Sequence, residues 1–336
     1  MWFQTSQLKQ ATARPKAPPQ IMFEFGSAFT RVILNGRLVF FEPTIFIRHK
    51  KLDKVWLIGE QAYQASDKLA TEFEAIWPIK RKAVTHQAYF QTFVRALLKK
   101  LDLNTVFSPW NRLKIGVILP SELSQPQAEV FQTGLKQVLP SVRFYTTESL
   151  LLHQASFTSG QRFAIDLGQT TTFWVFNAGN VLASKHYAWG TKELNELLRR
   201  QVETQHACQL DNVALDKLKK QLVDFRLFED DKLGKRLVTK VKLNQTGLGT
   251  AVMLKGEDLK PAVLVWQGQL LELVDDFFSQ LTGSVASGLV ENGLSLFGGL
   301  ANLHGLTQSL TPKLGCEVKI LAKPDLFLIN LLAKNA

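Results

Sequence analysis

Cysteine is scarce in this chain: 336 residues include only Cys208 and Cys316, and neither has metal-ligand spacing around it. The sequence therefore offers no disulfide framework and no cysteine-based zinc site, and we expect two reduced cytosolic thiols. Long apolar runs are lacking too, because no stretch reaches the ~18 residues that a membrane-spanning helix requires. The first residues contain no apolar core of a signal peptide, so we expect a cytoplasmic protein.

Acidic residues are outnumbered, with 29 Asp and Glu against 40 Lys and Arg, which gives a formal net charge of +11. Such a surface suits anionic lipid, nucleic acid or an acidic protein, and composition alone leaves these partners open. The basic clusters are short and do not alternate with aromatic residues, so nucleic acid is the least favoured of these partners. Solvated helix ends and loops are the simplest explanation of the clusters, followed by a lipid-facing surface.

A β-hairpin with an acidic residue before its turn is the most informative pattern in the sequence. Phe163–Leu167 forms an apolar strand, residues 168–171 a tight turn, and Thr172–Phe176 the returning strand, before residues 177–180 turn into a third strand. Backbone N–H groups and hydroxyls in such a turn can cradle phosphate oxygens, while Asp166 can hold a hydrated Mg²⁺.

The same pattern occurs near the start of the chain, in residues 21–40. The corresponding pairs are Glu24 and Asp166, Gly26 and Gly168, Thr30 and Thr172, and Asn35 and Asn177. Two unrelated hairpins with ordinary turn residues would explain either copy alone. Two copies in the same order, each opening an α/β segment, favour a duplicated domain with one phosphate hairpin in each half.

Other segments predict regular elements with less detail. Apolar residues at helical spacing predict helices over Ala88–Leu101 and Leu270–Leu289, and residues 224–268 are rich in strand formers. Leu294–Phe297 predicts a strand that runs into Gly298-Gly299 and a helix. This order can place helix N–H dipoles against a phosphate or nucleotide edge, but it is also an ordinary strand-to-helix turn.

Residues 1–20 form a distinct tail with two aromatic residues, Trp2 and Phe3, followed by a segment rich in proline and lysine. The aromatic pair could insert into a bilayer interface while the basic residues attract anionic lipid. A disordered start is the alternative.

The order of these motifs resembles that of the superfamily of actin, the heat-shock chaperone ATPases and the sugar kinases. In detail the chain is similar to the bacterial actin MreB family over most of residues 21–330. The matching stretches are Phe41–Thr44, Leu57–Ala62, Pro78–Lys80, Val117–Ser121, the helix that carries Glu148, and Phe297–Ala301.

This resemblance implies an α/β protein with an actin-like fold, in which two duplicated RNase H-like domains, or four subdomains, surround a nucleotide cleft. Domain I would comprise residues 21–155, with residues 315–336 packing back on it, and domain II residues 156–314. Residues 1–20 would be a tail that can anchor the protein to a membrane.

The resemblance also assigns roles to individual residues, with ATP or ADP and Mg²⁺ in the cleft. The phosphate loops would be Gly26, Ser27 and Ala28, and Gly168, Gln169, Thr170 and Thr171. The nucleoside would lie beside Asp216, Lys219, Gly298 and Gly299. Asp166 and Glu24 would hold the Mg²⁺ with its water shell, and Glu148 would position or deprotonate the attacking water.

Several of these positions depart from the family pattern. Glu24 replaces an aspartate, Phe29 an asparagine, Gln169-Thr170 two glycines, Arg81-Lys82 an Asp-Gly pair, and Leu300 a third glycine. A β-branched residue tolerates positive φ poorly, so the second loop is not expected to wrap a phosphate in the usual way. We therefore expect slow or lost ATP hydrolysis and leave a weak ATPase activity open.

The resemblance predicts a filament-forming, ATP-binding cytoskeletal protein that lies at the inner membrane and organises cell shape or wall synthesis. Its partners would be further copies in protofilaments, anionic lipid through residues 1–20, and membrane proteins of cell shape or wall synthesis. The alternative is a non-polymerising adaptor on the same fold, of the pilus-assembly or division-scaffold type. A sugar or acetate kinase is disfavoured, because neither a general base nor a polar substrate pocket is evident.

Overall fold

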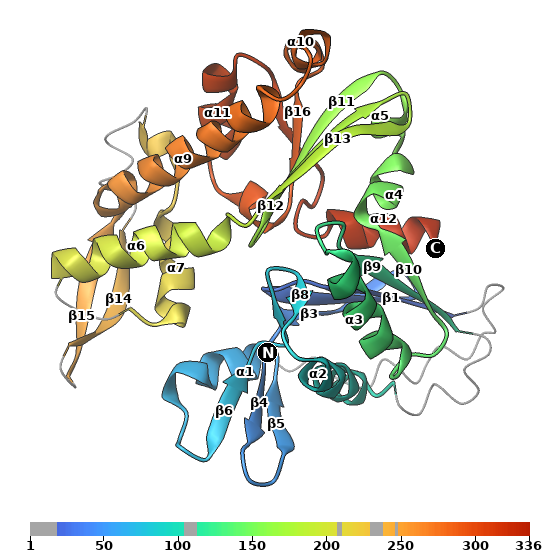
Figure 1. Cartoon of the computed structure of the whole chain (residues 1–336). Coiled ribbons are helices and arrows are strands. Elements are labelled where there is room, and N and C mark those ends of the chain that lie inside the picture. Colours follow the sequence, from blue (N-terminus) through green and yellow to red (C-terminus); the bar gives the residue numbers. More distant parts are fainter. Residues whose placement is uncertain (1–18, 104–112, 207–209, 229–237, 246–247) are drawn as a thin grey trace.

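The computed structural model of the protein describes residues 19–103, 113–206, 210–228, 238–245 and 248–336 (Figure 1). The tail proposed as a membrane anchor lies outside the described residues up to position 18, as does Cys208. None of the described helices is long and apolar enough to cross a bilayer.

Two five-stranded sheets form the centre of the molecule and share one topology. The first has the order β10-β9-β1-β2-β3, made of β1 (Gln20–Phe25), β2 (Phe29–Leu34), β3 (Arg37–Pro43), β9 (Lys114–Leu119) and β10 (Val142–Thr146). The second has the order β17-β16-β11-β12-β13, made of β11 (Gln161–Leu167), β12 (Thr171–Asn177), β13 (Asn180–Tyr187), β16 (Leu294–Phe297) and β17 (Val318–Ile320). In each sheet an antiparallel three-stranded meander is extended by two parallel strands. The repeated topology agrees with the duplication predicted from the paired hairpins.

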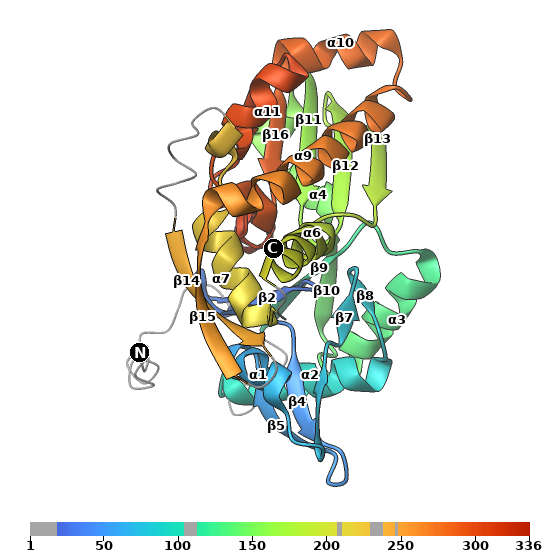
Figure 2. The ribbon, with the colours of Figure 1, turned by 90° about the vertical axis from the view of Figure 1, so that its left-hand side faces the viewer.

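Each central sheet carries a smaller appendage that extends the molecule on one side (Figures 1 and 2). The first has a three-stranded sheet of β4 (Phe46–His49), β5 (Lys54–Ile58) and β6 (Phe73–Ile76), with α1 (Glu60–Ala65), η2 (Ser66–Lys68) and the hairpin β7 (Ile79–Lys80)–β8 (Ala83–Val84). The second has the hairpin β14 (Val238–Gln245)–β15 (Leu248–Lys255), with α7 (Asn212–Leu222) and η4 (Phe225–Phe228). We call the first sheet with its appendage the first half and the second sheet with its appendage the second half.

The remaining helices pack on the sheets. They are α2 (Gln87–Lys100), α3 (Gln125–Lys136), α4 (Thr147–Leu152), α5 (Ala155–Thr158), α6 (Thr191–His206), α9 (Gly256–Phe278), α10 (Gly283–Asn292), η5 (Gly299–Asn302), α11 (Leu306–Leu314) and α12 (Phe327–Asn335). The five apolar residues that predicted α2 are all buried: Phe90, Phe93, Val94, Leu97 and Leu98. That prediction is confirmed.

The single helix expected over Leu270–Leu289 is two helices, because α9 begins at Gly256 and ends at Phe278, and α10 covers Gly283–Asn292. The side chain of Asp258 accepts a hydrogen bond from the Lys255 N–H (2.7 Å) and closes the start of the helix. Buried residues at helical spacing continue the apolar stripe upstream of position 270: Leu259, Val263 and Trp266. The sequence hid that period because Pro261 and Gly268, two residues that disfavour a helix interior, lie in this stretch.

The sequence had suggested that the two hairpins correspond residue for residue, but in the structure they do not. Glu24 pairs with Arg31 across the first hairpin, whereas Asp166 pairs with Thr172 across the second. The first loop is therefore one residue longer. In the next turn Asn35 has a φ of 49°, and the residue with the equivalent conformation is Ala178 (φ 47°) rather than Asn177. The equal spacing between acid and asparagine in the sequence is a coincidence.

The C-terminal helix α12 returns from the second half to the first and packs against β1, β9 and α4. Its apolar residues belong to a buried cluster between the two central sheets, which includes Met22 and Ile118 of the first and Trp174 and Phe297 of the second. The two halves are thus joined by a continuous apolar core as well as by polar contacts.

Candidate functional site

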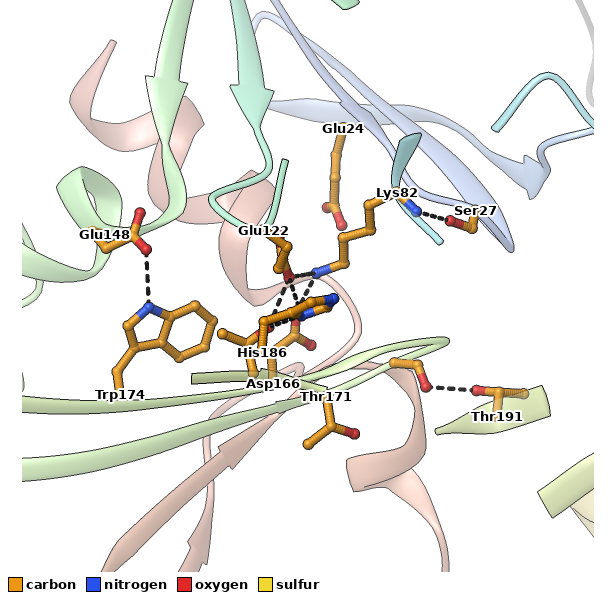
Figure 3. A network of polar contacts seen from close by, with 12 residues as sticks. Glu24, Ser27, Lys82, Glu122, Glu148, Asp166, Thr171, Trp174, His186 and Thr191 are labelled. Carbon is orange, nitrogen blue, oxygen red and sulfur yellow. Dashed lines mark hydrogen bonds and ion pairs between the residues drawn. The ribbon is translucent and has the colours of Figure 1, made fainter. Parts of the chain in front are cut away.

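Lys82 connects the two hairpin loops at the centre of the site (Figure 3). Its Nζ lies 2.7 Å from Glu122 Oε1 and 2.8 Å from Asp166 Oδ2. Its backbone N–H donates to Ser27 Oγ at 2.6 Å, in the first predicted phosphate loop. One residue therefore binds both predicted loop regions, with Ser27 and Glu122 in the first half and Asp166 in the second.

Glu122, which belongs to the first half, also contacts residues of the second half. Its side chain is 2% exposed, and its Oε1 also accepts a hydrogen bond from Thr172 Oγ1 at 2.8 Å. His186 Nδ1 lies 3.2 Å from the same hydroxyl and 4.0 Å from Glu122 Oε1. Lys82, Glu122, Asp166, Thr172 and His186 therefore form one polar network, which we call the cleft network.

Burial and charge set the protonation of the cleft network. Burial alone would lower the pKa of Lys82, but the adjacent carboxylates of Asp166 and Glu122 raise it above its ordinary value. Burial would likewise raise the pKa of Glu122, but the Lys82 ammonium holds it below its ordinary value. Burial raises the pKa of Asp166 despite the same ammonium, and it lowers the pKa of His186. The ammonium thus stays charged, with Glu122 as its ionised partner.

Glu24 lies beside the network but has its own cation. Its Oε1 is 2.9 Å from Arg31 Nη1, its neighbour across the hairpin. Burial raises the pKa of Glu24 although Arg31 opposes the shift. Glu24 and Asp166 influence one another electrostatically, so the structure brings the two predicted acidic residues to one place.

Buried polar atoms without a hydrogen-bond partner gather here. Among the described residues they are Glu24 Oε2, Arg31 Nε, Ser121 Oγ, Glu122 Oε2, Thr170 Oγ1 and Gln267 Oε1. All except the last belong to the hairpins or to the strand end that carries Glu122. Because a buried polar group without a partner is costly, their concentration points to a polar ligand or ordered water at this place.

The second predicted phosphate loop, Gly168–Thr171, is fixed by its own chain. The Gly168 N–H donates to Thr170 O (3.1 Å), and Gly168 O accepts from both the N–H and the Oγ1 of Thr191, each at 2.9 Å. Gly168, Gln169 and Thr170 are not among the described residues with positive φ. The β-branched Thr170 is therefore accommodated without strain, in a loop conformation that needs no glycine in place of Gln169 or Thr170. The first loop, which contains Gly26 and Ala28, likewise has negative φ throughout.

The predicted catalytic residue Glu148 lies in the first turn of α4, outside the cleft network. Its Oε1 accepts a hydrogen bond from the indole N–H of Trp174 at 3.0 Å. Trp174 is 1% exposed and stacks on Phe297. The carboxylate is thus tied to a rigid aromatic residue of the second sheet (Figure 3).

The two predicted adenosine glycines have different surroundings. Gly298 has a φ of +91°, and a Cβ there would lie 2.3 Å from Asp166 Oδ1 and 2.5 Å from Leu167 O. Its missing side chain leaves room for the Asp166 carboxylate. Gly299 has no atom within 4 Å of a built Cβ, so it faces open space.

The predicted nucleoside pair Asp216 and Lys219 takes part in a contact between the two appendages. Lys219 Nζ lies 2.9 Å from Asp216 Oδ1, and Tyr63 Oη donates to Asp216 Oδ2 at 2.7 Å. Asn212 donates to Asp67 through its backbone N–H and its side chain, each at 3.1 Å. We call these Tyr63 and Asp67 contacts the appendage clasp.

A Mg²⁺ ion does not fit the residues present. Asp166 Oδ2 is held by the Lys82 ammonium, and Asp166 Oδ1 is packed against Gly298. Glu24 is paired with Arg31. In the part of the chain that the structure describes, no group of three or more His, Cys, Asp or Glu side chains is arranged to hold a metal ion. The unpartnered polar atoms beside the loops are instead available to a polar ligand.

Sequence reasoning missed Glu122, His186, Trp174 and Tyr63 as site residues. Each meets its partners only through the fold: Glu122 and Thr172 are 50 positions apart, and Lys82 and Asp166 are 84 apart. The one available signal was the Arg81-Lys82 pair in place of Asp-Gly, which places a cation where the family has no side chain.

Comparison with known proteins identifies the family. The MreB/Mbl protein family matches residues 154–333. The cell shape-determining protein Mbl of Bacillus cereus (strain ATCC 10987 / NRS 248) is 18% identical over 320 residues, which cover 90% of this chain and 91% of Mbl. MreB5 of Spiroplasma citri bound to ADP superposes with a TM-score of 0.82 at 14% identity, covering 95% of this chain and 96% of that chain. The MamK double helical filament gives 0.72 at 13% identity, covering 94% and 99%.

These structures confirm the actin-like fold predicted from the sequence, and the family match confirms the resemblance to bacterial MreB. The match covers more than half of the residues, and so this chain belongs to the MreB/Mbl protein family.

Proposed function

We propose that this protein is a filament-forming cytoskeletal protein that binds adenine nucleotide in its cleft and hydrolyses it slowly or not at all. Family membership and the likeness to MamK, solved as a double helical filament, support self-association. The ADP-bound and AMPPNP-bound structures of MreB5 support a nucleotide in the cleft.

The bond between Glu148 and Trp174 carries the proposal of slow or lost hydrolysis. A carboxylate that orients an attacking water must direct a free oxygen toward the phosphate. Glu148 Oε1 accepts the indole N–H at 3.0 Å, and Trp174 is fixed by burial and by stacking on Phe297, so this bond uses one of the two carboxylate oxygens and fixes the direction of the other. The contact of Asp166 Oδ2 with Lys82 also favours slow or lost hydrolysis, because this oxygen is then not free to hold a metal ion.

Electron microscopy of the purified full chain without nucleotide, with ADP and with ATP tests assembly, and phosphate release from the same samples tests hydrolysis. We expect double protofilaments together with phosphate release at or near the rate of a sample without protein. Rapid phosphate release coupled to assembly would refute the proposed slow or lost hydrolysis.

A non-polymerising adaptor is the second candidate, and the appendage clasp favours it. Tyr63 and Asp67 fasten the first half to Asn212 and Asp216 of the second, which opposes the opening that nucleotide exchange requires. A monomer under every nucleotide condition would support this adaptor and would refute the cytoskeletal proposal.

We also propose attachment to anionic inner-membrane lipid through the tail, with membrane proteins of cell shape or wall synthesis as partners. Because β1 begins at Gln20, whose N–H bonds Asn35 Oδ1 at 2.9 Å, the truncated chain for this test should lack residues 1–18 only. In vesicle pelleting, the full chain should sediment with anionic but not with neutral vesicles. Equal sedimentation of the truncated chain would refute the anchor.

A further inference from the structure

We infer that the Lys82 ammonium takes the place of a divalent cation in this cleft, so that the site works without bound Mg²⁺. The replacement of the cation by Lys82 does not depend on a bound nucleotide. Its extension to nucleotide binding without Mg²⁺ rests on the proposed function.

The first argument is the position of the ammonium. It lies 2.7 Å and 2.8 Å from carboxylate oxygens that belong to different halves of the molecule, Glu122 Oε1 and Asp166 Oδ2. A hydrated Mg²⁺ would need oxygen ligands or water contacts on the same carboxylates. One oxygen of Asp166 is thus already bound to the ammonium, and the other lies beside Gly298.

The second argument is the backbone that carries Lys82. Arg81 and Lys82 form the two-residue turn between β7 and β8, and both have positive φ, 48° and 63°. Two-residue turns of this kind favour Asn-Gly or Asp-Gly, because residues with a Cβ are strained there. The turn tolerates this strain at Lys82, and its side chain makes the buried contacts. Its N–H bond to Ser27 Oγ fixes the direction in which the side chain leaves the turn.

The third argument is charge. Glu24, Glu122 and Asp166 bring three carboxyl groups together, and Arg31 neutralises only the first of them. Lys82 is the cation in direct contact with Glu122 and Asp166, whereas Arg31 acts on Asp166 from a distance and burial lowers the pKa of His186. The pKa of Lys82 is raised by these same neighbours, which agrees with a permanently charged ammonium. Buried carboxyl groups of this kind stay ionised only beside such an ammonium or a metal ion, and otherwise take up a proton.

The test replaces the ammonium and asks whether a metal ion can restore what is lost. Lys82→Gly removes the cation and suits the left-handed turn, so the backbone itself is not penalised. In EDTA we expect this variant to melt below the wild-type chain. Millimolar Mg²⁺ or Mn²⁺ should raise its melting temperature by a few degrees. This is the shift expected when the metal concentration is about ten times the dissociation constant of one site. The wild-type melting temperature should not respond.

Arg81→Gly is the matched control, because it changes the neighbouring, exposed residue of the same turn and leaves the ammonium in place. It should show no metal response. The double variant Lys82→Gly/Asp166→Asn should lose the metal response of the single variant, because it lacks the carboxylate that would hold the ion. A folded Lys82→Gly variant that ignores both metals would overturn the inference.

A second measurement covers the case in which Lys82→Gly does not fold. Electron paramagnetic resonance measures the binding of Mn²⁺ to the wild-type chain and to Asp166→Asn. We expect the same Mn²⁺ binding in both, because no Mn²⁺ site of the wild-type chain should depend on Asp166. A wild-type Mn²⁺ site that disappears in Asp166→Asn would overturn the inference.

The nucleotide is tested separately, by the melting temperature in ADP with either EDTA or Mg²⁺. We expect the same stabilisation of the wild-type chain in both conditions, and stabilisation that needs Mg²⁺ in Lys82→Gly. Stabilisation of the wild-type chain by ADP only in Mg²⁺ would overturn the inference. If ADP stabilises neither chain in either condition, the proposed nucleotide binding and its Mg²⁺-free extension fail, and the metal titrations alone decide the role of Lys82.

Discussion

Replacing Lys82 by methionine should destabilise the protein strongly, because it leaves two carboxyl groups without their cation. Lys82 is 16% exposed, Glu122 2% and Asp166 8% at the side chain, so solvent screens the contact only weakly. Removing one partner of a buried ion pair typically costs about 3–5 kcal/mol, whereas an exposed pair contributes about 0–1 kcal/mol. Adding Glu122→Gln to Lys82→Met should recover part of this loss, because the remaining carboxyl group, Asp166, already has a raised pKa and can take up a proton.

Urea unfolding followed by tryptophan fluorescence measures each member of this cycle. Lys80→Met provides the control, since Lys80 belongs to the same hairpin and is exposed. It should change the free energy of unfolding by less than about 0.5 kcal/mol. The coupling between Lys82 and Glu122 should reach about 2–3 kcal/mol, at the upper end for residues in contact. A loss below about 1 kcal/mol for Lys82→Met would refute the argument that two buried carboxylates depend on this residue.

Three further predictions follow from the site. Gly298→Ala should cost about 2–4 kcal/mol in urea unfolding, because its Cβ would clash with Asp166 and its φ is left-handed, whereas Gly299→Ala should cost less than about 1 kcal/mol; equal costs would contradict this. Tyr63→Phe removes a hydrogen bond to an acidic side chain in a half-buried place and should cost about 1–2 kcal/mol; no loss would mean that the appendage clasp adds no stability. Because the pKa of Asp166 is raised on folding, its ionisation destabilises the native state as pH rises from its ordinary pKa through its raised one. Asp166→Asn should remove this pH dependence. The free energy of unfolding of the variant should therefore rise relative to that of the wild-type chain as pH increases across the acid range; a difference that does not change with pH would contradict this prediction.

Local pattern was sufficient for the hairpins and their order. Alternating apolar residues and the turn at Asn35 fix a hairpin from within about ten residues of chain, and the repeat of this pattern indicated the duplicated halves. Glu24 and Asp166 could be expected at one place because duplicated sheets with a common cleft bring equivalent loops together.

The cleft network could not be predicted in the same way. Glu122 follows a strand end without any local signal of its role, and its partners come from three other elements. Lys82 was visible only as a departure from a family pattern, and the sequence does not say that its side chain turns inward. The extended start of α9 was missed for a different reason, because Pro261 and Gly268 are residues that disfavour a helix interior.

The chain passes between the halves at two places, through the segment around α4 and α5 and through the segment that leads to α12. Because α4 and α12 are in contact, these two passages lie next to each other. Opening the molecule therefore amounts to rotation about a line near the two passages, whereas sliding would have to break the apolar cluster that contains Met22 and Trp174. Lys82 bonds Asp166 and Tyr63 bonds Asp216, both in the second half, so both of their contacts must part in any wide rotation.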